Sequence, residues 1–347
     1  MAIDWGRGYE ATWHVYRVSR DTWADASELT GVTEVSVESS CDNEPLIQKG
    51  SLSVDVAPGT AFEEDYYRVV MVATQGAYQE RVELATLLCS SSEGEVNRGV
   101  DSVQIQGRSV LYPASRTQLE TGSYAPSGVN GVAYCADLLR ACTNAPVETQ
   151  GSFTLDDHLV FDAGSYVLDA VWGVLEAGSY VIEIEGDGTI MIMPKPTEPS
   201  LVLDDAGARL VHPGIRHSMD YSEVPNRYYA NENGVEEMAV NDDRSSVTST
   251  THRGWFSDQR DDSPTRVNGE TLHAYCERML EEASTVTDER TYSREWWPGV
   301  HPFDVVRGTL SSVGLDGDLR VVSQSVTCGR GVTVEERSNR EVHTWQR

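Results

Sequence analysis

The stretch EWWPGVHPFDVVR, from Glu295 to Arg307, contains the residues whose types and spacing come closest to a chemical site. His301 and Asp304 lie three positions apart, and a histidine beside a carboxylate is a pair that acid–base catalysis and metal binding both use. Pro298 and Pro302 flank His301, however, and a residue that precedes proline is driven towards extended backbone. The β-branched residues after Pro302 are typical of a strand start. We therefore expect Asp304 to bond to a nearby turn or arginine at a strand entry.

The remaining histidines do not suggest a metal site. They are His14, His158, His212, His217, His252, His273 and His343. His212 and His217 lie five residues apart in a segment without a helical pattern, so no regular element would bring them together. A surface or loop role is expected for these side chains, and the sequence predicts no metal ligands and no cofactor.

Other chemical motifs are equally weak. EIEGDGT and GLDGDL have closely spaced carboxylates, but no glutamate closes a twelve-residue calcium loop, and each fragment is predicted to be a hairpin turn. GxSxG, GxGxxG and P-loop patterns are missing from the sequence. A glycosidase stays an open alternative. So acidic a sequence contains many carboxylate pairs by chance, and only their separation in space decides whether a pair can perform that chemistry. The sequence predicts no catalytic residues and favours a protein that is not an enzyme.

The charge is strongly acidic, with 55 Asp and Glu against 27 Lys and Arg and a formal net charge of −28. Acids exceed bases in each of the three segments described below. Tight nucleic-acid binding needs basic side chains for the phosphates, and anionic membranes also attract basic segments, so both partners are disfavoured. The acidity fits either simple solubility or a surface that lets DNA slide past.

Cysteines and hydropathy suggest neither a metal site nor a membrane segment. The six cysteines form no CxxC pair, and Cys135 and Cys276 lie on the apolar faces of predicted helices, where we expect them to be buried. The opening residues MAIDWGRGYE lack the apolar core of a signal peptide, and no apolar run approaches transmembrane length. We expect synthesis in the cytoplasm and no membrane insertion.

The elements that must position these residues fall into three segments. Residues 1–113 alternate between apolar and polar positions as short strands do, which predicts an N-terminal β-barrel-like domain. Residues 114–210 begin with a polar linker, and then predict helices in VNGVAYCADLLRACT and SYVLDAVWGVLEAG and a hairpin around GDG. Residues 211–347 are mostly strands with one helix in GETLHAYCERMLEEAS, which predicts a second β-barrel-like domain. The predicted fold class is mainly β with an α/β insert (α+β): two β-barrel-like domains separated by a small helix–hairpin domain.

The order of these segments resembles the hub (baseplate hub) proteins of phage tails and related contractile injection systems. The resemblance is carried by the opening strands from WHVYRVS to YYRVVMVA, and by the helix, the DG hairpin and the proline exit of the insert. It continues in the VPNRYYANENG strand entry and in the final block from LHAYCERMLEEAS to LRVVSQSVTCGRG. The stretch NDDRSSVTSTTHRGWFSDQRDDSPTRVNG departs from the simplest hub pattern and is expected to be an exposed loop, either one that contacts another tail protein or a long flexible one.

The resemblance implies a structural function without chemistry. Such hubs are trimeric rings whose six barrels adapt to a sixfold tail tube, between the tube and the tail tip or spike. It implies a homotrimer that contacts tail tube, distal tail and spike or fibre proteins. It also implies an acidic channel through which DNA passes without specific binding, and a place in the virion tail after assembly in the host bacterial cytoplasm.

Two further expectations stay open at this point. A receptor- or carbohydrate-binding tail-tip protein is the main alternative function, because Trp255, Phe256, Trp296 and Trp297 could stack on sugars. If Trp296 and Trp297 instead fill a core or a subunit contact, Trp297→Ala should impair folding or ring formation. His301→Ala should leave assembly intact.

Overall fold

The computed structural model describes the chain as two compact units. The first contains residues 1–214 and 292–337, and the second contains residues 215–291 and 338–347. The residues described are 3–5, 7–41, 47–60, 62–97, 100–204, 214–266, 269–311 and 314–345. The predicted boundary at residue 210 and His212 lie outside the described residues, and the predicted boundaries at 113 and 210 stay predictions.

The first unit is built mainly from strands. Its strands are β1 (Glu10–Val18), β2 (Asp25–Glu28), β3 (Val32–Ser40), β4 (Ile47–Val56), β5 (Tyr66–Gln75), β6 (Tyr78–Asn97), β7 (Val100–Arg108), β8 (Tyr124–Ala125), β9 (Val147–Thr149), β10 (Leu159–Val160), β11 (Tyr180–Ile184), β12 (Ile190–Pro194), β13 (Pro199–Asp204), β19 (Val305–Leu310) and β20 (Leu315–Cys328). Strands β18 (Thr285–Glu295) and β21 (Val332–His343) each contribute residues to both units. The mainly β character that the sequence predicts is confirmed.

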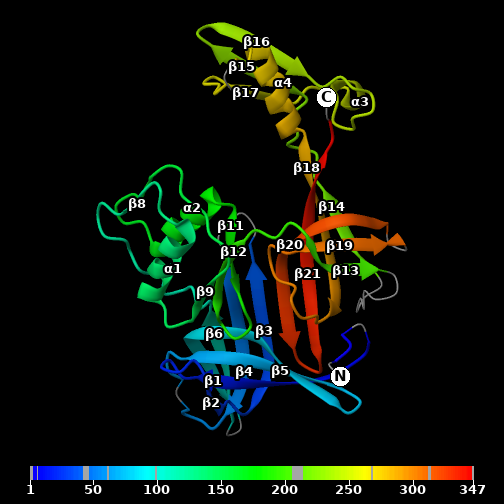
Figure 1. The fold of residues 1–347 in the computed structure, drawn as a ribbon. Coiled ribbons are helices and arrows are strands. Elements are labelled where there is room, and N and C mark those ends of the chain that lie inside the picture. Colours follow the sequence, from blue (N-terminus) through cyan, green and yellow to red (C-terminus); the bar gives the residue numbers. More distant parts are fainter. Residues whose placement is uncertain are drawn as a thin grey trace. The chain divides into compact units, whose positions relative to one another are not determined.

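One large sheet joins strands from both ends of the sequence (Figure 1). Its strands follow the order β14-β18-β21-β20-β3-β4-β7-β6-β5-β1-β2, in which β14 spans Arg216–Met219, and β19 adds to β20 and to β13. The key pairing is between β20 and β3, in which Val326 lies opposite Val37. Within the described residues the two ends of this path do not pair, so the sheet is open and is not a closed barrel. The expectation of barrel-like domains separate along the sequence therefore differs from the observed sheet.

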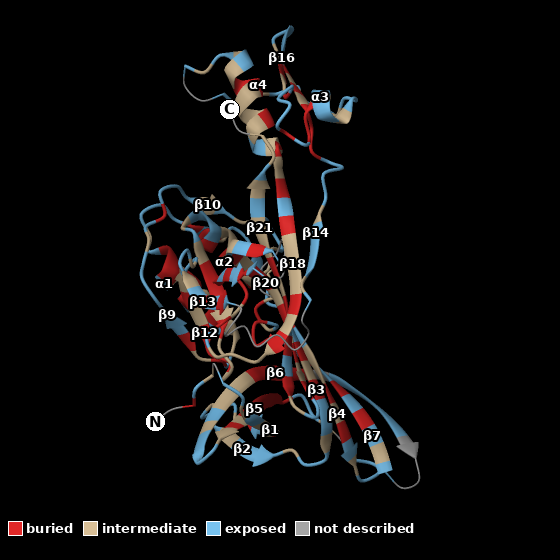
Figure 2. Cartoon of the chain, turned by 90° about the vertical axis from the view of Figure 1, so that its right-hand side faces the viewer, coloured by how far each residue is buried: buried red, intermediate tan, exposed pale blue. Residues whose placement is uncertain are grey.

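Alternation along the strands places one face of the sheet in a core. In β7, Val103, Ile105 and Gly107 are buried while their neighbours are exposed, and Figure 2 shows the buried and exposed stripes along the strand. Val15, Val35, Leu52, Met71 and Ile105 share one apolar cluster with residues of β20 and β21. At about 25 cal/mol per Å² of apolar surface removed from water, such side chains stabilise the pairing of distant strands.

The insert has its own core. Helices α1 (Gly131–Cys142) and α2 (Val167–Ala177) pack on each other, and β9 adds in parallel to the β11–β12 hairpin. Asn130 caps α1 by accepting from the backbone N–H groups of Val132 and Ala133. Both helices and the hairpin are confirmed, and Cys135 is fully buried as predicted. The short strand β9 was not predicted, because three residues carry too little periodicity.

The second unit is a small sheet covered by a helix. Strands β15 (Arg227–Glu232) and β16 (Val235–Val240) form an antiparallel hairpin, and β17 (Asp258–Asp261) pairs in parallel with β15. Helix α4 (Leu272–Ala283) buries Tyr275, Cys276 and Leu280 against this sheet, which confirms the third predicted helix and the burial of Cys276. Strand β14 (Arg216–Met219) pairs with β18.

The polar stretch predicted to be an exposed loop is instead partly ordered by its own side chains. It contains helix α3 (Thr250–Arg253) and β17, and Asn241, Ser246 and Thr248 are almost fully buried. Asn241 Nδ2 donates to Ser246 Oγ at 2.9 Å, and the Ser246 and Thr248 hydroxyls lie 3.2 Å apart. Buried polar groups are stable when they bond to each other, and alternation of apolar residues gives no signal for such a core.

A buried ion pair links three strands of the first unit. Arg294 of β18 and Glu336 of β21 are both almost completely buried, and Arg294 Nη2 lies 2.7 Å from Glu336 Oε2. Gln324 of β20 donates to the same carboxylate at 2.9 Å, and Tyr292 donates to its other oxygen. A buried charge is tolerated when it is paired and its remaining lone pairs accept hydrogen bonds.

One turn prediction was wrong. The fragment GLDGDL was expected to form a hairpin turn, but Leu315 to Asp318 belong to β20, opposite β19. The chain instead reverses between Leu310 and Leu315, where Gly314 has a positive φ of 68°. The two aspartates and the second glycine resemble turn residues, but their neighbours on β19 impose a strand.

Candidate functional site

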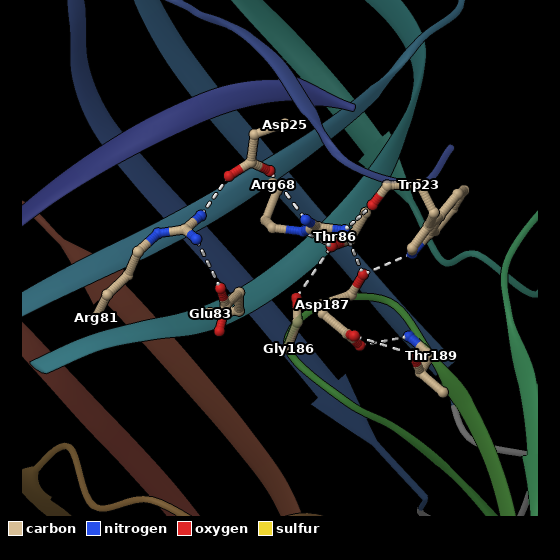
Figure 3. Close-up of polar contacts among 9 residues, drawn as sticks. All are labelled: Trp23, Asp25, Arg68, Arg81, Glu83, Thr86, Gly186, Asp187 and Thr189. Atoms are coloured by element: carbon tan, nitrogen blue, oxygen red, sulfur yellow. Dashed lines mark hydrogen bonds and ion pairs between the residues drawn. The ribbon is translucent and has the colours of Figure 1, made fainter. Parts of the chain in front are cut away.

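The turn of the β11–β12 hairpin docks on the large sheet, and Figure 3 shows the contacts. Gly186 lies so close to β6 that an added Cβ would meet the backbone oxygen of Glu83 at 1.9 Å. Gly188 has φ of +85°, and its Cβ would meet Thr86 at 2.8 Å. The GDG sequence therefore does more than reverse the chain, because glycines alone permit this close approach.

Arg68 of β5 is the centre of the polar contacts around this turn. Its side chain is only 7% exposed, and it donates to Asp25 Oδ1 at 2.9 Å and to the backbone oxygen of Asp187 at 2.8 Å (Figure 3). It also donates to the backbone oxygen of Trp23 and to Thr86 Oγ1. The Arg68 guanidinium thus connects the hairpin turn to Asp25 of β2, to Thr86 of β6 and to the backbone of Trp23.

Three neighbouring side chains extend this network. Trp23 Nε1 donates to the Asp187 backbone oxygen at 2.8 Å, and Arg81 bridges the Asp25 and Glu83 carboxylates (Figure 3). Thr86 Oγ1 donates to the Gly186 backbone oxygen at 3.0 Å. The hairpin turn is therefore held by hydrogen bonds to the backbone oxygens of Gly186 and Asp187. These bonds do not depend on which side chains the turn carries.

Next to this turn, His301 lies against two glutamates of the hairpin. His301 Nε2 is 3.3 Å from Glu183 Oε1, and one ligand atom from each of Glu183, Glu185 and His301 lies within 4.8 Å of the others. The His301 backbone N–H donates to Asp304 Oδ2 at 2.8 Å, which fixes the turn before β19. The hairpin and the β18–β19 connection thus meet at a cluster of four titratable groups.

Burial shifts the proton affinities of this cluster. It raises the pKa of Glu183 to about 7, and repulsion from Glu185 adds to the rise. Burial also raises the pKa of Asp304 to about 6, against the hydrogen bond from the His301 backbone. The pKa of His301 is lowered, again chiefly by burial. Each shift favours the neutral form, as expected for charges removed from water.

Two hollows border the cluster. A cavity of about 50 Å³ is lined by Glu183 and His301 together with Gln48, Trp297 and Gln324. A groove of about 520 Å³ adjoins it, lined by the charged residues Glu80, Arg81, Glu83, Glu148, Glu185, Asp187 and His301 among others. The cavity is too small for a sugar ring, since pockets for small ligands have volumes of about 300 Å³ or more. The groove is acidic, with one arginine among five carboxylates.

Part of this site was predicted from the sequence. The structure confirms that Asp304 bonds to a turn directly before a strand, and that β19 begins at Val305. It places His301 at a contact that the sequence did not predict, because Glu183 and Glu185 lie more than a hundred residues away. The alternation in YVIEIEG directs Glu183, on β11, and Glu185, directly after it, to the same side of the chain, and that pattern is the signal available in the sequence.

The aromatic residues occupy different environments. Trp296 packs edge-on against Trp5 at 5.4 Å and joins the apolar cluster of the sheet, as a core residue would. Trp296 and Trp297 both line the 50 Å³ cavity, and Trp296 also lines the adjoining groove. In the second unit Trp255 and Phe256 are 49% and 62% exposed, with Arg253 over the Trp255 ring and Arg227 over the Phe256 ring.

Most of the other histidines lie at the surface, as predicted. His158, His217, His252, His273 and His343 are exposed, and half-buried His14 pairs with Glu28 at 2.7 Å. His273 lies near Glu237 through Nδ1 and near Glu277 through Nε2, so these carboxylates contact opposite sides of its ring.

Comparison with known structures identifies the fold. No protein-family model matches the chain, and no curated protein is significantly similar to it in sequence. The fold is similar to that of the tail protein from Neisseria meningitidis MC58, with a TM-score of 0.62 and 13% identity over 96% of this chain and 97% of the other. The 43 kDa tail protein of prophage MuSo2 from Shewanella oneidensis gives a TM-score of 0.58 at 10% identity, covering 96% and 98%.

Part of a bacterial protein complex shares the same fold. The chain matches part of the Francisella PdpA–VgrG complex with a TM-score of 0.55 and 8% identity, over 96% of this chain and 58% of the other. Identities this low show the fold alone. The resemblance to phage tail hub proteins is confirmed at that level, because both tail proteins are matched over nearly their whole length. No helix in the described ranges is long and apolar enough to cross a membrane.

Proposed function

We propose that this protein is a structural component of a phage tail, the hub that forms a ring between the tail tube and the tail tip or spike. The observation that carries the proposal is the match to two tail proteins over nearly the whole chain, with both ends of the sequence contributing to one sheet. A fold shared over its full length supports a shared mechanical role more strongly than a local motif does.

The proposed assembly is a homotrimer. Three copies form a closed ring through heterologous contacts, in which one surface of each copy binds a different surface of the next. The open edge of the sheet at β2 and the second unit are different surfaces that could serve in such contacts. The partners would be tail tube, distal tail and spike or fibre proteins, and the location would be the virion tail after assembly in the bacterial cytoplasm.

The acidity supports a channel for DNA. The formal charge of −28 leaves few basic side chains to neutralise phosphates, and the described groove beside the hairpin is itself acidic. Carboxylates that line a ring would repel the DNA backbone and let it pass without specific binding. On this account the protein is not an enzyme, and DNA is cargo that passes through the ring.

The oligomeric state tests the proposal directly. The purified 38.2 kDa chain, alone and with its neighbouring tail proteins, should give a species of about 115 kDa by size-exclusion chromatography with light scattering, as three copies require. A chain that stays monomeric at all concentrations and in the presence of those partners would contradict the ring.

A receptor- or carbohydrate-binding role at the tail tip is the second candidate. Its support is the pair of exposed aromatic side chains Trp255 and Phe256, each stacked by an arginine. Aromatic rings stack on sugar faces, but they also serve in protein contacts. Binding of the chain to host cells or to a glycan array, lost in Trp255→Ala but retained in Trp23→Phe, would favour this role over the hub.

A further inference from the structure

We propose that Glu183, Glu185 and His301 bind one divalent transition-metal ion, with Zn²⁺ as the best match. The site would join the β11–β12 hairpin to the connection between β18 and β19. The sequence predicted no metal ligand, because the histidine and the glutamates come from segments far apart. The proposal is independent of the proposed function and would hold for a tail hub or for a receptor-binding protein.

The geometry is that of a preformed ligand set. Zinc bonds of about 2.0–2.1 Å to nitrogen and oxygen place two tetrahedral ligands about 3.3 Å apart. His301 Nε2 and Glu183 Oε1 are separated by 3.3 Å, and the third ligand atom, from Glu185, completes a set within 4.8 Å. Glu185 is half-buried at the start of the turn, and its side chain would have to move to bring its carboxylate to bonding distance.

The charges around the cluster favour a cation. Among the described residues, neither Glu183 nor Glu185 forms an ion pair with arginine or lysine, and the Glu183 side chain is only 12% exposed. Two carboxylates held together with little water repel each other, and a bound cation would offset that repulsion. The nearby Arg81 pairs instead with Asp25 and Glu83.

A second observation comes from the adjoining 50 Å³ cavity. Gln48 lines this cavity with Glu183 and His301, and it is 6% exposed. Its Oε1 is buried and has no hydrogen-bond partner within the described residues, although its Nε2 donates to Ser39. A buried acceptor without a donor is costly, and a water bound to the metal ion would supply one.

The ligand types select the ion class. An imidazole with two carboxylates suits zinc and its transition-metal neighbours, whereas Mg²⁺ and Ca²⁺ prefer oxygen ligands alone. The acidic groove of about 520 Å³, which Glu185 and His301 also line, gives the ion a route from solvent and leaves room for water as a fourth ligand.

Isothermal titration of the tag-free, chelator-treated full chain with ZnCl₂ tests the site. We expect one Zn²⁺ per chain, with affinity lowered at least about tenfold in Glu185→Gln and in His301→Ala, since even outer-shell changes cost that much. His273→Ala is the matched control, because its two glutamates contact opposite ring nitrogens and do not converge on one ion. It should bind Zn²⁺ like the wild type.

Three results would overturn the proposal: no saturable binding at one equivalent, unchanged affinity in both site variants, or displacement of Zn²⁺ by equimolar Mg²⁺. Thermal melting provides a second readout. Zn²⁺ should raise the melting temperature of the wild type and of His273→Ala but not of Glu185→Gln. Because Glu185 is only half-buried, Glu185→Gln should fold like the wild type. Equal shifts in all three proteins would place the metal elsewhere.

Discussion

At the scale of single residues, the first unit depends on charges that are buried and mutually satisfied. Glu336 on β21 accepts from Arg294 and Tyr292 of β18 and from Gln324 of β20, and none of these groups could be left alone without a cost. Arg68 plays a similar part under the hairpin turn. The hydrogen bonds of these side chains determine which strands lie side by side, whereas apolar contacts alone would allow one strand to slide along another.

Removing one partner of the buried pair should therefore be costly. We expect Glu336→Ala to lower the free energy of unfolding by about 3–5 kcal/mol, because it leaves the Arg294 guanidinium buried without a counter-charge. Asp318→Ala is the control: it breaks the Arg307 pair, which has a similar 2.6 Å contact but lies at the surface, and it should change stability little. Urea denaturation of both variants checks this, and equal effects would contradict it.

Thiol reactivity gives a prediction on pH. Burial raises the pKa of Cys135 and of Cys328 to about 12, so both thiols stay protonated in the folded protein up to that pH. An unfolded thiol ionises near its ordinary pKa of about 9, so the folded state holds more protons between these values. Stability should therefore fall as pH rises through this window.

Mass spectrometry after iodoacetamide treatment near pH 8 checks the thiols. Cys41, which is half-buried, should be alkylated in the folded chain, whereas Cys135 and Cys328 should react at comparable rates only in denaturant. Rapid alkylation of Cys135 in the native protein would show that the helix pair around it is less tightly packed than described.

At the scale of elements, the β11–β12 hairpin shows what sequence can and cannot predict. Alternating isoleucines around GDG predict a hairpin, and the apolar periodicity predicts the three long helices. The docking of the turn on β6 could not be predicted, because the close approach of Gly186 to Glu83 joins distant segments. For the same reason the sequence did not predict the cluster of Glu183, Glu185 and His301, although the alternation of YVIEIEG places the two glutamates on one side of the hairpin.

Substitution of Gly186 tests this docking. Gly186→Ala should destabilise the chain by about 3 kcal/mol, because its Cβ would meet a backbone oxygen at 1.9 Å and the strand cannot yield as a side chain does. The matched control is Gly173→Ala in α2, where nothing lies within 4 Å, and it should stabilise by about 0.5–1 kcal/mol through helix propensity. A neutral Gly186→Ala in thermal melts would contradict the docked turn.

At the scale of the whole molecule, strands that begin and end the sequence share one sheet. The mainly β character predicted from the sequence is confirmed, but the sequence placed the final strands in a barrel-like domain of their own. Periodicity reports which face of a strand is buried and not which strand lies beside it, so the pairing of β20 with β3 had no local signal. The same limit explains why the polar core of the second unit was taken for a loop.

The central claim, that this fold builds the ring of a phage tail hub, is tested most directly by electron microscopy of the assembled protein viewed down its axis. Three copies should form a closed ring with threefold symmetry, a central opening and carboxylates at its rim. An open filament, isolated monomers in the presence of the tail partners, or a closed channel lined by arginine would contradict the account.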